Sequence, residues 1–242
     1  IVTVTSRLCL DRLRRHERSR RSYVGPWLPE PIVGGEDTVG ERITLDDSVR
    51  MALLVVLERM SPAERASFIL HDVFGLRFAE IGEIVGRSEA ACRQLAARGR
   101  RRVHDDAPPG TPSAAGDHAE LARRFASACS DGDLDGLIAV LASDAVGDFD
   151  SGGLVPGAPL VELDGAEPIA RQLVATVSSL GARFPRCSIN GGPGVLVVKD
   201  DTVLAAIALG VHRNLIDVVH GIGNPAKLTH LTSSTSDPFS DF

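Results

Sequence analysis

Two short helical patterns separated by a glycine lie between Phe78 and Val103, and this stretch constrains the fold more than any other part of the chain. In the first pattern, apolar residues recur at spacings of three and four residues, which predicts one apolar helix face. Gly86 then interrupts the pattern and can adopt the left-handed conformation that ends a helix, and Ser88 can cap the helix that follows. Two helices joined by a tight, glycine-containing turn predict a helix-turn-helix.

The second helix of this pair has two faces of different chemistry. One face carries small or apolar residues and can lie close against a neighbour: Cys92, Ala96, Gly99 and Val103. The other face is polar and cationic, which suits DNA because arginine pairs with guanine, glutamine pairs with adenine and further arginines neutralise phosphates. A solvated amphipathic hairpin has the same periodicity, so the pattern alone leaves both interpretations open. The residues that we expect to contact DNA are Ser88, Glu89, Arg93, Gln94, Arg98, Arg100, Arg101 and Arg102, the last three through phosphates.

Two further helices precede this pair. Ser61 and Glu64 have the spacing of a capping box, with a proline at the first helical position between them, and they predict the start of a helix. Before it, Asp46 or Asp47 can cap another run of helical periodicity. Residues 44–104 therefore predict a compact all-α domain of four helices.

Residues 79–86, together with the run Arg98-Gly99-Arg100, resemble region 4 of the sigma-70 family, most closely that of the extracytoplasmic-function type. Residues 61–75 resemble the same region nearly throughout. The resemblance implies that this domain reads the promoter −35 element, and that the partners are promoter DNA and the RNA polymerase core, through its β flap and β′ subunits. Gly99 stands where the family usually has alanine, a change that lowers helix propensity.

The basic segment 1–22 resembles the end of region 2 of the same family, which contacts the −10 element. The solvated end of an ordinary helix is the alternative for this segment. Because the rest of region 2 is absent from this sequence, we expect the chain to be a fragment of a longer protein.

Charge and composition divide the chain into two modules. Residues 1–106 contain 18 arginines and 16 acidic residues (net +2), whereas residues 107–242 contain 8 lysines and arginines and 16 acidic residues (net −8). Two stretches rich in proline and glycine, 23–43 and 105–116, are predicted linkers. The first carries the only tyrosine and the only tryptophan of the chain. We therefore expect it to dock on a folded domain, although a simple spacer is compatible with this composition.

Residues 117–231 predict a second, α+β domain. Helical periodicity comes first, over 118–129, 134–141 and 166–180, and β-type runs follow at 187–190, 194–199, 203–209 and 215–219. We expect an antiparallel sheet with a hairpin turn at 199–202. This order, with the run GDLDGLIAVLASDAV, resembles the SnoaL-like domains of the cone-shaped fold that ketosteroid isomerases share.

Catalytic members of that fold use a carboxylate base, in some cases with a histidine or tyrosine. This domain shows no acid–base pair at a specific spacing and has no tyrosine. We therefore assign no catalytic residue and expect the chain not to be an enzyme. The carboxylates and histidines considered are Asp148, Asp150, His212, Asp217 and His220.

A more specific resemblance covers the whole chain. One group of extracytoplasmic-function sigma factors carries a SnoaL-like C-terminal extension and three motifs: a Trp-Leu-Pro-Glu-Pro linker, an Asp-Gly-Gly-Gly-Lys/Arg loop and an Asn-Pro-Asp-Lys-Leu segment. The linker is intact here, the loop reads DSGGL from Asp150 and has lost its cation, and the segment reads NPAKL from Asn224. The resemblance implies autoregulation in which the extension holds the linker, with no separate anti-sigma factor required. The residues that we expect to form this interdomain contact are Trp27, Leu28, Pro29, Glu30, Pro31, Asp150, Gly152, Gly153, Asn224, Pro225, Lys227 and Leu228.

Other features narrow the class of protein. The four cysteines are widely spaced, so we predict no metal site, no disulfide and no cofactor. No apolar run approaches membrane-spanning length and the start is not a signal peptide, so we expect a cytoplasmic protein with no membrane partner. Residues 232–242 are rich in Ser, Thr and Asp and predict a disordered tail.

Two alternatives to a sigma factor stay open: a ligand-sensing transcription regulator that is not a sigma factor, and a SnoaL-like isomerase or cyclase.

Overall fold

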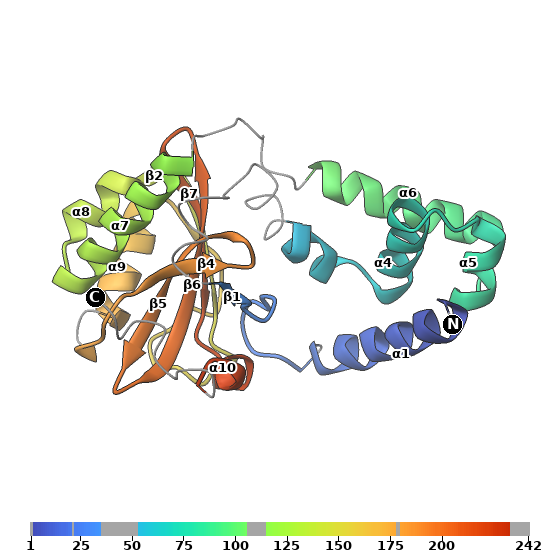
Figure 1. Cartoon of the computed structure of the whole chain (residues 1–242), viewed down its shortest axis with the longest axis horizontal. Coiled ribbons are helices and arrows are strands. Elements are labelled where there is room, and N and C mark those ends of the chain that lie inside the picture. Colours follow the sequence, from blue (N-terminus) through green and yellow to red (C-terminus); the bar gives the residue numbers. More distant parts are fainter. Residues whose placement is uncertain (1, 21, 35–52, 106–114, 178–179, 233–242) are drawn as a thin grey trace. The chain divides into compact units, whose positions relative to one another are not determined.

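The computed structural model describes residues 2–20, 22–34, 53–105, 115–177 and 180–232 (Figure 1). They belong to two compact units, the first made of residues 1–23 and 52–108 and the second of residues 24–51 and 109–242. The second unit thus includes the proline-rich linker, although this linker connects two parts of the first unit. The predicted cap at Asp46 or Asp47, most of the linker 105–116 and all but the first residue of the tail 232–242 lie outside the described residues.

The first unit is all-α. Its elements are α1 (Val2–Arg20), a helix over residues 53–59, α4 (Pro62–Phe68), the π-helical turn η1 (Ile69–Val73), α5 (Phe78–Val85) and α6 (Glu89–Asp105). The predicted capping box at the start of α4 is confirmed. The Ser61 hydroxyl accepts a hydrogen bond from the Glu64 N–H, and the Glu64 carboxylate accepts one from the Ser61 N–H.

Two apolar clusters form the core of this unit. Val56, Leu57 and Met60 pack with Phe68 and Val103 in one of them. The other consists of Leu10, Leu70, Ile81, Ile84, Val85 and Cys92. Leu10 comes from α1, so the helix that resembles the end of region 2 contributes to the core of the helix-turn-helix domain.

The second unit is α+β. Its helices are α7 (Ala115–Asp131), α8 (Leu134–Val140), α9 (Ala166–Val177) and α10 (Pro225–Thr232). Its strands are β1 (Val33–Gly34), β2 (Leu141–Asp150), β3 (Leu163–Asp164), β4 (Arg186–Ile189), β5 (Gly192–Lys199), β6 (Thr202–His212) and β7 (Leu215–Ile222). They form one sheet in the order β1-β4-β5-β6-β7-β2-β3.

The helices α7, α8 and α9 lie on one side of this sheet (Figure 1). They bury a core with Phe125, Leu137 and Ile169, and the sheet contributes Val195 and Val219. Phe149 packs against this core from β2. Side chains alternate along a strand, so its neighbours Asp148 and Asp150 point to the opposite face of the sheet.

Most of the predicted elements are confirmed, including the hairpin turn at 199–202, where Asp200 and Asp201 have positive φ angles of 47° and 58°. The four predicted strands, β4 to β7, pair antiparallel as expected, whereas β2, which was not predicted, pairs with β7 in parallel. Four elements were not predicted: β1, β2, β3 and α10. The predicted helix 134–141 ends at Val140, and Leu141 begins β2. Among the described helices, none is long and apolar enough to cross a membrane.

Candidate nucleic-acid interface and linker-binding site

The helix-turn-helix has the local geometry that its sequence predicts. Gly86 ends α5 in the left-handed conformation (φ 73°), and its N–H donates to the Gly82 carbonyl over 2.9 Å. The Ser88 hydroxyl accepts a hydrogen bond from the Ala91 N–H over 3.3 Å and so caps α6. A Cβ at Gly82 would lie only 2.7 Å from the Arg87 carbonyl oxygen, so the turn packs directly against α5. These contacts fix the angle at which α6 leaves the turn.

Helix α6 presents its small residues to the rest of the unit. Cys92 and Ala96 have no exposed surface. A Cβ added to Gly99 would lie 2.9 Å from the Phe68 Cβ and 3.6 Å from the Met60 Sδ. The glycine that lowers the helix propensity of α6 therefore also allows α6 to lie close to α4.

The opposite side of α6 is open to solvent. All eight residues that we expect to contact DNA are exposed: Ser88, Glu89, Arg93, Gln94, Arg98, Arg100, Arg101 and Arg102. Within the first unit, nothing in the described residues covers this cationic side. Its exposure is what a helix needs in order to enter the major groove.

Most of these arginines have partners within the unit. Arg93 is paired with Glu89 over 2.6 Å, and its guanidinium lies 5.4 Å from the centre of the Phe78 ring. Arg98 lies 3.5 Å from the Glu64 carboxylate. Both members of the Arg93–Glu89 pair are exposed, and such pairs contribute about 0–1 kcal/mol, so a phosphate or a base edge can replace the Glu89 carboxylate.

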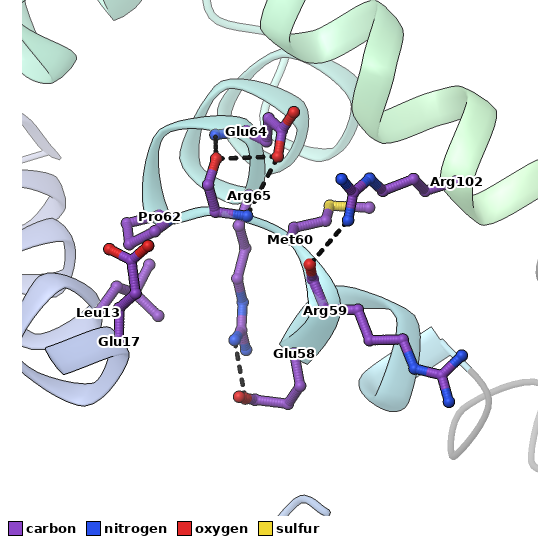
Figure 2. Close-up of a pocket in the computed structure, with 10 residues that line it drawn as sticks. Leu13, Glu17, Glu58, Arg59, Met60, Pro62, Glu64, Arg65 and Arg102 are labelled. Atoms are coloured by element: carbon purple, nitrogen blue, oxygen red, sulfur yellow. Dashed lines mark hydrogen bonds and ion pairs between the residues drawn. The ribbon is translucent and has the colours of Figure 1, made fainter. Parts of the chain in front are cut away.

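Two of the arginines assigned to phosphates bridge α6 to distant parts of the unit. Arg100 is paired with Asp72 of η1 over 2.7 Å. Arg102 donates to the Arg59 carbonyl over 2.8 Å (Figure 2). Sequence reasoning missed these roles, because the partners lie 28 and 43 residues away. For the Arg101 and Gln94 side chains, the described part of the chain provides no ion pair and no hydrogen bond.

Figure 2 shows the cavity that lies beside this bridge, between α1, α4 and the end of α6. It has a volume of about 440 Å³, and three arginines and three glutamates line it. Arg65 pairs with Glu58 over 2.8 Å, and Glu64 is engaged in the capping box. Burial raises the pKa of Glu64, but hydrogen bonds from Ser61 and the charges of nearby arginines outweigh it, so the pKa lies below its ordinary value. The ion pair and the capping box that line this cavity connect the start of α4 to the residues before it.

The second unit holds the linker through the main chain of Leu28. The Leu28 N–H donates to the Asp150 carboxylate over 2.8 Å, and the Lys227 ammonium donates to the Leu28 carbonyl. Lys227 is also paired with Asp150 over 2.6 Å, and both side chains are almost fully buried. The same ammonium lies 3.5 Å from the centre of the Trp27 ring. Leu28 itself is 1% exposed.

The linker then continues along the edge of the sheet. His230 Nε2 lies 2.8 Å from the Pro31 carbonyl oxygen. The Ile32 N–H donates to the Asn190 side chain, and the Asn190 N–H donates to the Ile32 carbonyl, each over 2.8 Å. Val33 then pairs with Ile189 as β1 joins β4. We call Asp150, Asn190, Lys227 and His230 the linker-binding site.

The remaining motif residues lie around this site. Gly153 has a positive φ angle of 73°, and a Cβ there would lie 2.9 Å from Val24 of the linker. Gly152 also has a positive φ angle, whereas Leu154, which stands in place of the family's cation, is 66% exposed. Asn224 accepts a hydrogen bond from the Ala226 N–H before α10. The other expected contact residues differ in burial: Leu228 and Pro31 are buried, Pro29 is partly buried, and Glu30 and Pro225 are exposed.

Sequence reasoning did not identify Asn190 or His230 as linker-binding residues. Asn190 and Gly191 form a tight turn between β4 and β5, with φ angles of 51° and 87°. An Asn-Gly pair between two β-type runs is a hairpin signal that could have indicated this turn. His230 follows Lys227 by three residues on α10, a helix that was not predicted. Neither residue carries a sequence signal for its contact with the linker.

The carboxylates and histidines considered for catalysis have other surroundings. Asp150 is part of the linker-binding site. Asp148 and His220 face each other on β2 and β7, with 3.7 Å between the carboxylate and Nδ1. Burial raises the pKa of Asp217 above its ordinary value, and His212 ends β6. No group of three or more potential metal ligands occurs among the residues that the structure describes.

Comparison with known proteins agrees with both units. Residues 50–103 match the family described as "Sigma-70, region 4". The chain is 35% identical over 233 residues to the probable ECF RNA polymerase sigma factor SigI of Mycobacterium tuberculosis, covering 96% of this chain and 78% of that protein. It is 40% identical over 187 residues to the ECF RNA polymerase sigma factor SigJ of the same species, covering 75% of this chain and 58% of that protein.

The crystal structure of Mycobacterium tuberculosis SigJ superposes with a TM-score of 0.66 at 32% identity, covering 94% of this chain and 80% of that chain. The alignment thus spans the helix-turn-helix domain and the SnoaL-like α+β extension. It favours neither a transcription regulator of another class nor an isomerase or cyclase. With a region 4 helix-turn-helix and relatives aligned over nearly its whole length, the chain belongs to the extracytoplasmic-function sigma factors of RNA polymerase.

Proposed function

We propose that α6 reads the −35 element of the promoter while the second unit controls this activity by holding the linker. The observation that supports the first part is the exposure of the whole cationic side of α6 within a helix-turn-helix that matches region 4. Arg93 and Gln94 lie near the start of α6, where a recognition helix contacts base edges, and Arg101 lies further along, where phosphates are reached.

In this proposal the domains are those expected from the sequence, with the region 4 domain at 44–104 and the regulatory domain at 117–231. The partners are promoter DNA and the RNA polymerase core, contacted through its β flap and β′ subunits, which places the protein in the cytoplasm. In this proposal the extension acts without catalysis, and Asp150, one of its carboxylates, binds Lys227 and the linker.

The control that we propose depends on the linker-binding site. A linker held by its own main chain at Leu28, Pro31 and Ile32 has little freedom. Since this linker joins the helix that resembles region 2 to region 4, its capture restricts how far apart the two promoter-reading regions can move. No separate anti-sigma factor is then needed.

The test is transcription in vitro from a cognate promoter, with holoenzyme assembled from core polymerase and the full-length protein. Arg93→Ala should reduce promoter-specific initiation, whereas Arg123→Ala, a change of an exposed arginine on α7, should not. Trp27→Ala should change the amount of transcript without changing the start site. Promoter-specific transcription that is unaffected by Arg93→Ala would contradict the assignment of α6.

A further inference from the structure

The linker-binding site recognises mainly the backbone of its occupant. Asp150 accepts from the Leu28 N–H, Lys227 donates to the Leu28 carbonyl, and Asn190 forms two hydrogen bonds with the main chain of Ile32. The β1–β4 pairing adds a short strand to the edge of the sheet. Main-chain contacts and strand addition are how protein domains bind extended peptides of differing sequence.

Selectivity comes from only a few side chains of the linker. Leu28 and Pro31 are buried, whereas Glu30 and Ile32 between and after them are exposed. The Trp27 ring lies against the Lys227 ammonium in a cation–π contact. The site therefore reads an aromatic residue, then leucine, then proline three residues later. Proline suits this position because it restricts the backbone and so lowers the entropy lost on binding.

The groups that bind the linker belong to the folded body of the second unit. Asp150 ends β2, Asn190 follows β4, and Lys227 and His230 lie on α10. They are 122 to 199 residues away from their partners in the linker. The site can therefore make the same contacts with a separate peptide as with its own linker. The linker has the advantage of being tethered, which gives it an effective concentration on the order of millimolar.

We propose that the second unit is a peptide-binding domain, and that its linker-binding site accepts an extended aromatic-Leu-x-x-Pro peptide in trans when its own linker leaves. The second unit would then bind a peptide segment of another protein, and not a small molecule inside its fold. This inference rests on the proposed control by the linker and names the kind of partner that would relieve it.

The experiment uses the whole chain with Trp27→Ala and Leu28→Ala, which weakens its own linker and removes its only tryptophan. The probe is a synthetic peptide with the sequence of residues 24–33, VGPWLPEPIV, which supplies the only tryptophan in the mixture. Binding should move the peptide's emission to shorter wavelength and saturate. Lys227 should at the same time become protected from an acetylating reagent, with the exposed Lys199, the only other lysine, as the internal reference.

The matched controls are a peptide with Leu28→Ala and a chain that also carries Lys227→Met, each of which should weaken binding about tenfold or more. If the double variant does not fold, Trp27→Phe combined with Leu28→Ala serves as the acceptor, because it keeps a ring, lacks indole fluorescence and still weakens the chain's own linker. No saturation at millimolar peptide, or equal binding by the Lys227→Met chain, would overturn the inference. Transcription that responds to Trp27→Ala without any peptide binding would leave the proposed control standing and refute only the binding in trans.

Discussion

The buried pair of Lys227 and Asp150 provides the sharpest test of how the linker is held. Their side chains are 5% and 0% exposed, the atoms are 2.6 Å apart, and both also bind the main chain of Leu28. Removing one member of a buried ion pair leaves the other charge uncompensated and destabilises a protein by about 3–5 kcal/mol. We expect Lys227→Met and Asp150→Asn each to have an effect of this size on the docked linker.

The double variant should behave differently. Asp150→Asn with Lys227→Met removes both charges and keeps an amide oxygen that can accept from the Leu28 N–H. Its loss of stability should therefore be smaller than the sum of the two single losses, by a coupling energy of about 1–3 kcal/mol. If a single loss exceeds the free energy of docking, the linker leaves the site without denaturant.

Trp27 makes this measurable, because it is the only tryptophan of the chain and lies against Lys227. Its emission, followed through a urea titration, gives the free energy of linker release, while circular dichroism follows the sheet of the second unit. Lys199→Met is the matched control and should leave the midpoint unchanged, since Lys199 is exposed at the end of β5. Single variants with the wild-type midpoint, or a double variant as unstable as the sum of the two, would refute this account of the linker contact.

The first unit gives four further predictions. Arg93→Ala should cost about 1–3 kcal/mol in binding to a promoter duplex and relax sequence preference, whereas Arg101→Ala should weaken all duplexes equally and reduce the salt slope by about 1, as measured by fluorescence anisotropy. Gly99→Ala should lower the thermal midpoint despite a better helix propensity, since the new methyl group would lie 2.9 Å from a neighbouring side chain; a higher midpoint would contradict the close packing of α6. Leu10→Ala should destabilise the unit by about 2–5 kcal/mol in urea unfolding, because its side chain is buried in the core, and a change within error would mean that α1 is not part of that core. Glu64 has a lowered pKa, so the stability it adds is complete above its ordinary value of 4.5 and lost as pH falls through the folded value; Glu64→Gln should reduce the acid sensitivity of unfolding in this range.

The features of the helix-turn-helix that could be predicted from the sequence are local. The turn at Gly86, the cap at Ser88 and the capping box at Ser61 each depend on residues within four positions of one another, so their signals are contained in short stretches. The internal partners of Arg100 and Arg102 are not local. A pattern of arginines on one helix face cannot show which of them reach an acidic residue or a carbonyl elsewhere in the fold.

Strand β2 was missed for a related reason. It carries Asp148 and Asp150 at buried positions, and aspartate is disfavoured in strands when only local sequence is considered. The strand forms because it pairs with β7 and because its carboxylates meet His220 and Lys227, residues about 70 positions later. Strand β1 depends in the same way on β4, which no property of the proline-rich linker indicates.

In the control that we propose, the contact between the linker and the linker-binding site must open, and the chemistry of the site suits this. An apolar interface of the same size would lose its full hydrophobic contribution on release and would be difficult to open. The site instead centres on two buried charges, Asp150 and Lys227, that regain hydration when the linker leaves, and this gain offsets part of the lost contacts. Among the described linker residues, Leu28 and Pro31 are buried in it, and Trp27 is partly buried. The hydrogen bonds to the linker require one backbone register and so make its binding specific. We expect the hydration of the two released charges to lower the net free energy of docking, as the proposed exchange with a partner peptide requires.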